Sequence, residues 1–175
     1  MKYETLANKE TVEKTIKSLG ERNVEAIFVE NSSEALEKIK ELIPEGVSVM
    51  NGASKTLEQL GFIDYLKSGE HKWNNLHEAI LAEKDPAKQA ELRKKSVLSD
   101  YYLGSVHALA ETGEFVIASN TGSQLPHIVF TSPNLIFVAS TKKIVPTLKE
   151  ATLRLYDHVI PLEDERMMGL YNIHT

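Results

Sequence analysis

The sequence predicts an α/β fold with a mostly parallel sheet, and three observations lead to this prediction. Within residues 24–50, a short β-prone segment, an amphipathic helix and a second apolar segment follow one another, which is the strand–helix–strand pattern of a parallel sheet. The segment 135–140 ("LIFVAS") is apolar along nearly its whole length, as expected for a strand covered on both faces. The segments 100–110 and 114–119 are predicted to be two strands around the turn Glu-Thr-Gly at 111–113, which adds a β-hairpin.

The first part of the chain contains two predicted helices and two predicted strands. Apolar residues recur at helical spacing before Gly20, and this glycine ends the first helix. The β-prone segment 24–30 is the first predicted strand. Asn31 caps a helix with its apolar stripe in 35–43, and the segment 47–50 is the next strand.

The middle of the chain is predicted to be mainly helical. Ser54 caps a helix that extends over 54–61. Residues 63–95 are mostly polar and helical, with a break where Asp85 acts as a cap and Pro86 takes the first helical position.

The end of the chain departs from the strand–helix alternation. Residues 145–159 form the last predicted helix, whereas 161–175 is predicted to be irregular and without a final strand. This irregular ending fits either a chain that ends there naturally or a truncated one. We expect one domain over residues 1–175, a length that suffices to bury a sizeable core.

Composition and charge exclude several classes of protein. The net charge of −5 and the lack of a long Lys/Arg run argue against nucleic acid as a partner. The chain has no cysteine, so it cannot form disulfides, use a thiol in catalysis or hold a cysteine-ligated iron–sulfur cluster. Without an apolar signal core or a run long enough to span a bilayer, we predict a cytoplasmic protein with no membrane insertion.

Ligands of parallel sheets bind beyond the carboxyl ends of the strands, which selects the loops 51–56, 104–105, 119–124 and 140–143. "NGASKT" and "SNTGSQ" combine glycine with hydroxyl groups, a composition that suits phosphate or carboxylate groups. Ordinary capped turns would have the same composition, and this alternative stays open. The predicted ligand-binding residues are Gly52, Ser54, Lys55, Thr56, Ser105, Thr112, Gly113, Asn120, Thr121, Gly122 and Ser123.

Glu111 is the predicted catalytic residue. A carboxylate at a strand end beside glycine can act as a nucleophile or a general base. The alternative is a solvated turn residue. His107, in the preceding strand, either tunes that acid or is simply packed. If the strand 114–119 is antiparallel to its predecessor, Glu111 and Asn120 lie at its opposite ends, and one ligand could hardly touch both.

Metal and cofactor sites are not predicted. The histidines lack the helical spacing with an intervening acid that marks zinc proteases, and His71 and His77 are six positions apart on a polar helix. We therefore expect no metal and no cofactor. Trp73 is expected to anchor a core or an interface.

The second half carries motifs that resemble the lactate-utilisation (LUD) domain family, which includes lactate utilization protein C. These are "SDYYLGSVHALAETGEFVIASNTGSQLP", "LIFVASTKKIVPTLKEATLRL" and "VIPLEDER", and "NGASKTLEQLG" matches a signature in the first half. The resemblance covers about residues 24–165, and the combination of motifs is specific although each alone is weak.

The resemblance implies a fold and a role. The fold would be the three-layer α/β/α architecture of ribose-phosphate isomerase, glucosamine-phosphate deaminase and the CoA-transferases. The role would lie in oxidising L-lactate to pyruvate beside iron–sulfur subunits, with this chain as a non-redox subunit that binds a small anionic metabolite. Many members have an arginine where this chain has Gln124, which weakens any grip on a strong anion. Members also usually continue beyond the "PLEDER" region.

Two further functions stay open at this point. One is an enzyme acting on a phosphorylated sugar, a CoA ester or a folate, like the fold relatives. The other is a non-catalytic interaction module in which the loops are only turns. Whether the chain catalyses a reaction, and whether it forms a homo-oligomer, is left open as well.

Overall fold

The computed structural model describes residues 3–175, and the chain forms two compact units. Unit 1 comprises Met1–Phe28, Val106–Asn120 and Ala139–Thr175. Unit 2 comprises Val29–Ser105 and Thr121–Val138. The single domain expected over residues 1–175 stays a prediction, and each unit is described by itself.

Unit 2 is built on a parallel sheet, here called sheet A, with the strand order β2-β1-β3-β6. Its strands are β1 (Ser48–Asn51), β2 (Asn74–Asn75), β3 (Tyr101–Gly104) and β6 (Asn134–Phe137). All three strand pairings are parallel, with Val49 opposite Tyr101 and Leu103 opposite Ile136. The carboxyl ends of the four strands therefore lie at one edge of the sheet.

Three helices of unit 2 start at the caps that the sequence predicts. The helical elements of unit 2 are α2 (Ser32–Leu42), α3 (Lys55–Gln59), α4 (Phe62–Ser68), α5 (Leu76–Ala82), α6 (Pro86–Lys95), the short 3₁₀ turn η1 (Ser96–Leu98) and the π-helical turn η2 (His127–Thr131). The side chain of Asn31 accepts from Glu34 N, that of Ser54 from Leu57 N, and that of Asp85 from Ala87 N. Three predicted caps are thus confirmed.

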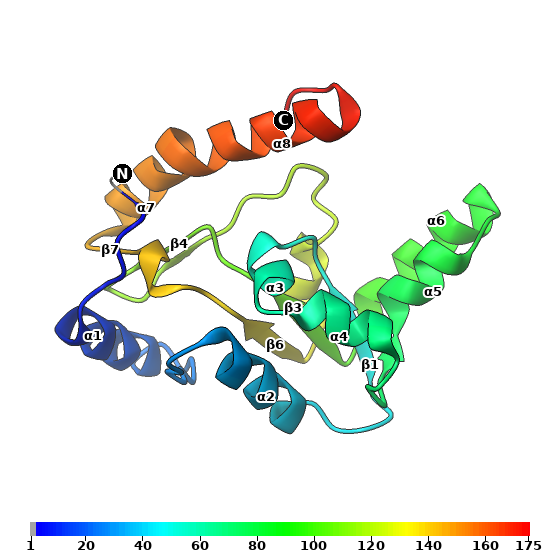
Figure 1. Cartoon of the computed structure of the whole chain (residues 1–175), viewed down its shortest axis with the longest axis horizontal. Helices are drawn as coiled ribbons and strands as arrows, with labels where there is room; N and C mark the ends of the chain where they lie inside the picture. Colours follow the sequence, from blue (N-terminus) through cyan, green and yellow to red (C-terminus); the bar gives the residue numbers. More distant parts are fainter. Residues whose placement is uncertain (1–2) are drawn as a thin grey trace. The chain divides into compact units, whose positions relative to one another are not determined.

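The core of unit 2 lies between sheet A and its helices. α3 and α4 lie beside β1 and β3, and α5 and α6 run side by side (Figure 1). The fully or nearly buried side chains include Ile39, Val49, Leu57, Phe62, Leu66 and Leu103. Trp73 belongs to this core and donates from Nε1 to the carbonyl oxygen of Ile43 at 3.2 Å, so its predicted anchoring role is confirmed.

Unit 1 holds a smaller, mixed sheet, here called sheet B, with the order β5-β4-β7. Its strands are β4 (Ala108–Ala110), β5 (Phe115–Val116) and β7 (Ile144–Val145). Its helical elements are α1 (Lys9–Gly20), the 3₁₀ turn η3 (Thr141–Lys143), α7 (Leu148–Arg154), the π-helical turn η4 (Leu155–Val159) and α8 (Ile160–Tyr171). The antiparallel pairing of β4 with β5 confirms the predicted hairpin around residues 111–113. α7, η4 and α8 follow one another as a continuous rod (Figure 1).

The fold is α/β, with a parallel sheet and a hairpin, as the sequence predicts. Three local predictions are wrong. Residues 24–30 form no strand, although they are β-prone, because a strand needs a partner to pair with and both sheets are completed by other segments. The segment 100–110 is not one strand but divides into β3 and β4, which belong to different sheets. The segment 161–175 is mostly helix α8 and not irregular.

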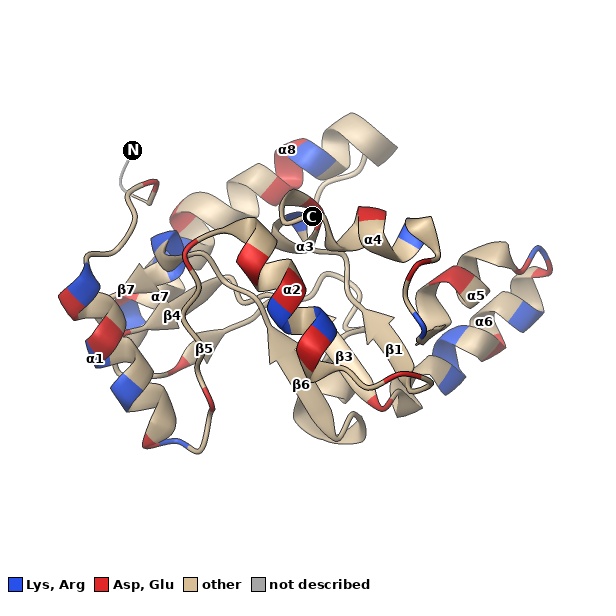
Figure 2. Ribbon diagram, turned by 60° about the horizontal axis from the view of Figure 1, so that its bottom comes forward, with Lys and Arg blue, Asp and Glu red and all other residues tan. Residues whose placement is uncertain are grey.

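Charged residues of both signs follow one another along α1 and α2 (Figure 2). Exposed pairs such as Lys40 with Glu37 and Lys38 with Glu41 connect neighbouring turns of α2. Such pairs contribute little each to stability, about 0.3–0.5 kcal/mol. Within residues 3–175, none of the helices combines the length and the apolar character required to cross a membrane.

Candidate functional site

The carboxyl edge of sheet A brings together residues from three loops of unit 2. β1 ends at Asn51 and continues into Gly52, and β3 ends at Gly104 and continues into Ser105. The hydroxyl of Ser105 donates to the carbonyl oxygen of Val138, just beyond β6, at 2.5 Å. It also lies 3.4 Å from the hydroxyl of Thr56 at the start of α3. The predicted residues Gly52, Thr56 and Ser105 therefore meet at one edge.

Gly52 is required by a close approach and not by an unusual backbone angle. A Cβ atom at this position would lie 2.3 Å from the hydroxyl oxygen of Tyr102 and 3.3 Å from Oε1 of Gln124. The Tyr102 hydroxyl donates to that Oε1 at 3.2 Å. The loop 121–124 is thereby attached to the same edge through Gln124.

The ring of Tyr102 packs against a buried polar network. Its ring stacks on the imidazole of His127, with centroids 4.5 Å apart. Nδ1 of His127 lies 2.9 Å from the hydroxyl of Ser132, which in turn lies 3.0 Å from that of Ser99. Burial lowers the pKa of His127 and raises the pKa of Tyr102 to about 12, so both groups are neutral at pH 7.

Other predicted binding residues of unit 2 use their side chains within the protein. The Ser54 hydroxyl caps α3, and the ammonium of Lys55 pairs with Glu58 at 3.1 Å. The Thr121 hydroxyl lies 3.0 Å from that of Ser123, and Gly122 has a φ of +71°. These contacts are those of a capped helix and a tight turn. The role of these residues as ligands of an anion stays a prediction.

The turn 111–113 lies in unit 1, where α1 and the residues just after it contact the turn. Nζ of Lys14 contacts Oε2 of Glu111 at 2.7 Å, and Nε of Arg22 donates to the carbonyl oxygen of Thr112 at 2.8 Å. Gly113 has a φ of +91°, and a Cβ there would lie 2.9 Å from Nε of Arg22. Each of these contacts gives the residues a structural role, and the catalytic role of Glu111 stays a prediction. Asn120, also in unit 1, is exposed and follows β5 at the end away from this turn.

His107 lies in front of β4 and does not act on Glu111. Its Nδ1 accepts from the backbone N–H of Ala118 at 3.2 Å. Burial, and then the nearby Lys143 and Arg154, lower the pKa of His107, while Glu163 raises it. The tuning of Glu111 by His107 is therefore not supported by the contacts of this imidazole.

A cavity of about 200 Å³ lies at the same edge of sheet A, and Asn51 is one of the residues that line it. Asn51 ends β1 and Asn75 ends β2, and these strands are neighbours. The remaining walls come from α4 and α5. The lining residues are Asn51, Ile63, Leu66, Lys67, Asn75, His77, Glu78 and Leu81. Its position beyond two adjacent strand ends is the one that ligands of parallel sheets occupy.

Asn51, the last residue of β1, determines which ring nitrogen of His77 carries the proton. Nδ2 of Asn51 donates to the carbonyl oxygen of Gly52 at 3.3 Å, so Oδ1 of Asn51 faces Nδ1 of His77 at 3.3 Å. An amide oxygen only accepts, and Nδ1 of the imidazole therefore carries the proton. Burial, and to a smaller extent Arg93, lower the pKa of His77, so the ring is neutral at pH 7. Its other nitrogen, Nε2, is left as a hydrogen-bond acceptor.

Two opposite charges and an apolar wall complete the cavity. Lys67, in the last turn of α4, and Glu78, in the first turn of α5, are exposed residues of its lining. Ile63, Leu66 and Leu81 provide the apolar surface. A cation, a neutral imidazole acceptor and an apolar wall suit a short organic acid with a second polar group. Within residues 3–175, three or more His, Asp or Glu side chains do not gather in a way that could hold a metal ion.

Sequence reasoning missed this cavity because it missed β2. Residues 63–95 appear mostly helical, so the strand end at Asn75 and the loop before α5 were hidden. The available signal was local: Asn75 stands three residues before Glu78, and its side chain accepts from Glu78 N at 3.2 Å as a helix cap. Asn51 is the first residue of the selected loop 51–56, but it was not among the residues predicted to bind a ligand.

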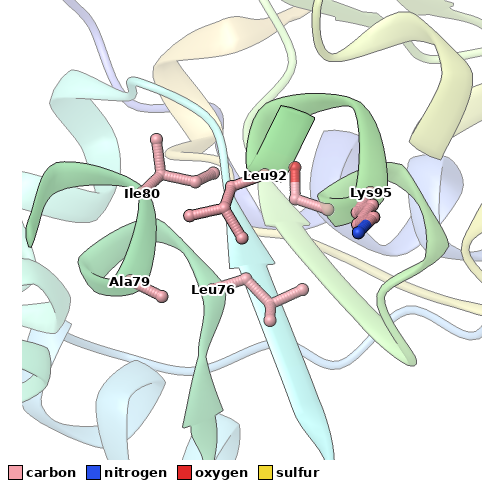
Figure 3. Close-up of a pocket in the computed structure, with 6 residues that line it drawn as sticks. Leu76, Ala79, Ile80, Leu92 and Lys95 are labelled. Atoms are coloured by element: carbon pink, nitrogen blue, oxygen red, sulfur yellow. The ribbon is translucent and has the colours of Figure 1, made fainter. Parts of the chain in front are cut away.

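A second cavity, of about 90 Å³, lies on another side of α5. Leu76, Ala79 and Ile80 of α5 face Leu92 of α6 there, with Lys95 at one end (Figure 3). The sixth lining residue, Ser96, donates its hydroxyl to the carbonyl oxygen of Arg93. This small and mainly apolar space lacks the convergent polar groups of the first cavity.

Comparison with known proteins gives one result. The sequence profile described as "LUD domain" matches residues 12–172, which is nearly the whole chain. The searches of curated proteins and of solved structures found no match. The profile thus extends beyond the residues 24–165 that the motifs cover.

Proposed function

We propose that this chain, which belongs to the LUD domain family, binds a short 2-hydroxy acid such as L-lactate in the cavity beside Asn51. Membership of the family supports a role related to lactate utilisation. The observation that carries the proposal is the neutral imidazole of His77, with its proton fixed on Nδ1 by Asn51. Nε2 of His77 would accept a hydrogen bond from the ligand's hydroxyl group.

The other lining residues supply the remaining contacts of such a ligand. The ammonium of Lys67 would attract the carboxylate, and Leu81 with Ile63 would face the methyl group. A volume of about 200 Å³ is small beside the roughly 300–1,000 Å³ of sites for larger ligands. This size argues against a CoA ester or a folate enclosed in the cavity. The predicted residues Gly52, Ser54, Lys55, Thr56 and Ser105 would then shape the adjoining part of the edge.

The role proposed is that of a non-redox subunit. Oxidation of lactate to pyruvate removes two electrons and two protons, and the cysteine-free chain cannot hold a cysteine-ligated cluster to receive the electrons. We therefore assign the electron acceptor to separate iron–sulfur subunits. This chain would bind the small anion and present it.

The test compares propionate, L-lactate, pyruvate and L-alanine, which differ only in the group on the second carbon. Binding to the full chain would be measured by calorimetry at pH 7.5. We expect L-lactate to bind about tenfold more tightly than propionate, since one hydrogen bond contributes about 1–1.5 kcal/mol. Pyruvate has no hydroxyl to donate and should resemble propionate. Equal binding of all four acids, or tightest binding of alanine through Glu78, would show the proposal to be wrong.

Variants and pH separate the two polar contacts. Lys67→Ala should weaken all four acids alike, whereas Lys72→Ala, which removes an exposed lysine paired with Glu45, should have no effect. His77→Leu should remove only the preference for lactate. The pKa of His77 is lowered, so the preference should be complete at neutral pH and disappear as the pH falls below that pKa, when Nε2 gains a proton and becomes a donor.

A further inference from the structure

Two cations of unit 1 approach neighbouring carbonyl groups from different elements. Lys143, the last residue of η3, donates from Nζ to the carbonyl oxygen of Val106 at 2.9 Å. Arg154, the last residue of α7, donates from one terminal nitrogen of its guanidinium group to the carbonyl oxygen of His107. Two consecutive carbonyl groups at the entry to β4 thus accept hydrogen bonds from an ammonium and a guanidinium group.

The guanidinium group of Arg154 is buried and incompletely satisfied. The residue is only 4 % exposed, and its Nε is buried with no hydrogen-bond partner. Arg154 lies within electrostatic reach of Glu4, but Glu4 pairs with Lys142 and His158, and among residues 3–175 Arg154 forms no ion pair of its own. The ring of Tyr3 lies 5.5 Å from the guanidinium carbon. A buried N–H without an acceptor carries a substantial free-energy penalty.

The surroundings of Arg154 are electropositive. Burial, and then repulsion from Arg154, lower the pKa of Lys143 to about 8. Burial also lowers the pKa of His158, and Arg154 adds to that effect. The carboxylates nearby are already engaged: Glu4 pairs with Lys142 at 3.2 Å, and Glu163 pairs with Arg166 at 2.6 Å. A negatively charged group here would relieve repulsion between the cations and supply the missing acceptor.

We propose that Arg154 and Lys143 form an oxyanion-binding site within unit 1, for a carboxylate or phosphate group that accepts from Nε of Arg154. A guanidinium group with a second cation beside it is a common way to bind such groups. The Tyr3 ring lies over the guanidinium and also contacts the ring of His158, at 5.4 Å between centroids.

The test uses acetate and inorganic phosphate on the full chain, with chloride at matched ionic strength as the blank. The nitrogen and proton resonances of Arg154 Nε are followed by NMR. A shift with acetate alone identifies a carboxylate site, a shift with phosphate alone identifies a phosphate site, and a shift with both identifies a general oxyanion site. The absence of a shift with either anion contradicts the proposal.

A second measurement follows the amine of Lys143. Its rate of acylation at different pH values, read by mass spectrometry, gives its pKa with and without the anion. We expect the bound anion to raise the pKa of Lys143 from about 8 toward the ordinary lysine range. An unchanged pKa of Lys143 in the presence of the anion would contradict the proposal.

Variants complete the design. Lys143→Gln should weaken anion binding by about tenfold, because a charge-assisted contact is lost, and Lys143→Arg should retain most of the affinity. Lys17→Gln, which removes an exposed lysine of α1, is the control and should leave the affinity unchanged. His77→Leu, in unit 2, should also leave the Arg154 shift intact, which makes this inference independent of the function proposed for the cavity of sheet A.

Discussion

The turns at Gly52 in unit 2 and at Gly113 in unit 1 have the same character in the sequence. Both follow a strand, contain a glycine and carry hydroxyl or charged neighbours. Their surroundings differ. At Gly113, Lys14 of α1 and Arg22, two residues after that helix, bind the turn. Gly52 faces Tyr102 and Gln124, and the preceding residue, Asn51, lines a cavity. A polar turn after a strand therefore becomes a candidate site only where neighbouring elements leave a space and do not bind it themselves.

Replacing Gly113 by alanine should have the largest effect, because two penalties combine there. The backbone has a φ of +91°, and the new Cβ would meet the carbonyl oxygen of Ser18 at 3.0 Å. We expect a loss of about 3 kcal/mol in the free energy of unfolding, measured with urea and circular dichroism. Gly122→Ala is the control, since Gly122 has a φ of +71° but no neighbour within 4 Å. Equal losses in the two variants would contradict a tightly held turn at 113.

Gly52→Ala should be the next most damaging change, at about 2 kcal/mol, because of the Tyr102 hydroxyl. This penalty should be reversible. Removing the hydroxyl with Tyr102→Phe eliminates the 2.3 Å contact, so the double variant should be more stable than Gly52→Ala alone. A double-mutant cycle in urea measures the coupling. Simple additivity of the two changes would mean that Gly52 is not required by Tyr102.

Glu111→Gln should have the smallest effect, about 0.5 kcal/mol on unfolding. The change weakens one ion pair with Lys14, whose side chain is 60 % exposed. Lactate binding, measured by calorimetry, should be unchanged, in contrast to the loss expected for His77→Leu. If Glu111→Gln abolished binding in a fully folded protein, the assignment would reverse, and the turn of unit 1 would be the functional one.

The sequence by itself determined the α/β class, the hairpin, three helix caps and the family. These features depend on short-range patterns: Asn31, Ser54 and Asp85 cap helices through atoms within three residues of themselves. It also located one edge of a sheet correctly, because "NGASKT" follows a strand directly. The composition of this loop does not determine whether its residues bind a ligand, and the binding experiments above test that point.

Only the tertiary structure decided which segments pair and which polar groups meet. The β-prone residues 24–30 found no strand partner, whereas the polar pair Asn74–Asn75 became β2 because β1 lies beside it. That pairing places His77 against Asn51, 26 positions earlier, and fixes the proton on its ring. Likewise, Arg154 reaches the carbonyl of His107 across 47 positions. Such contacts depend on long-range packing, because no local propensity encodes which distant residue will be the neighbour.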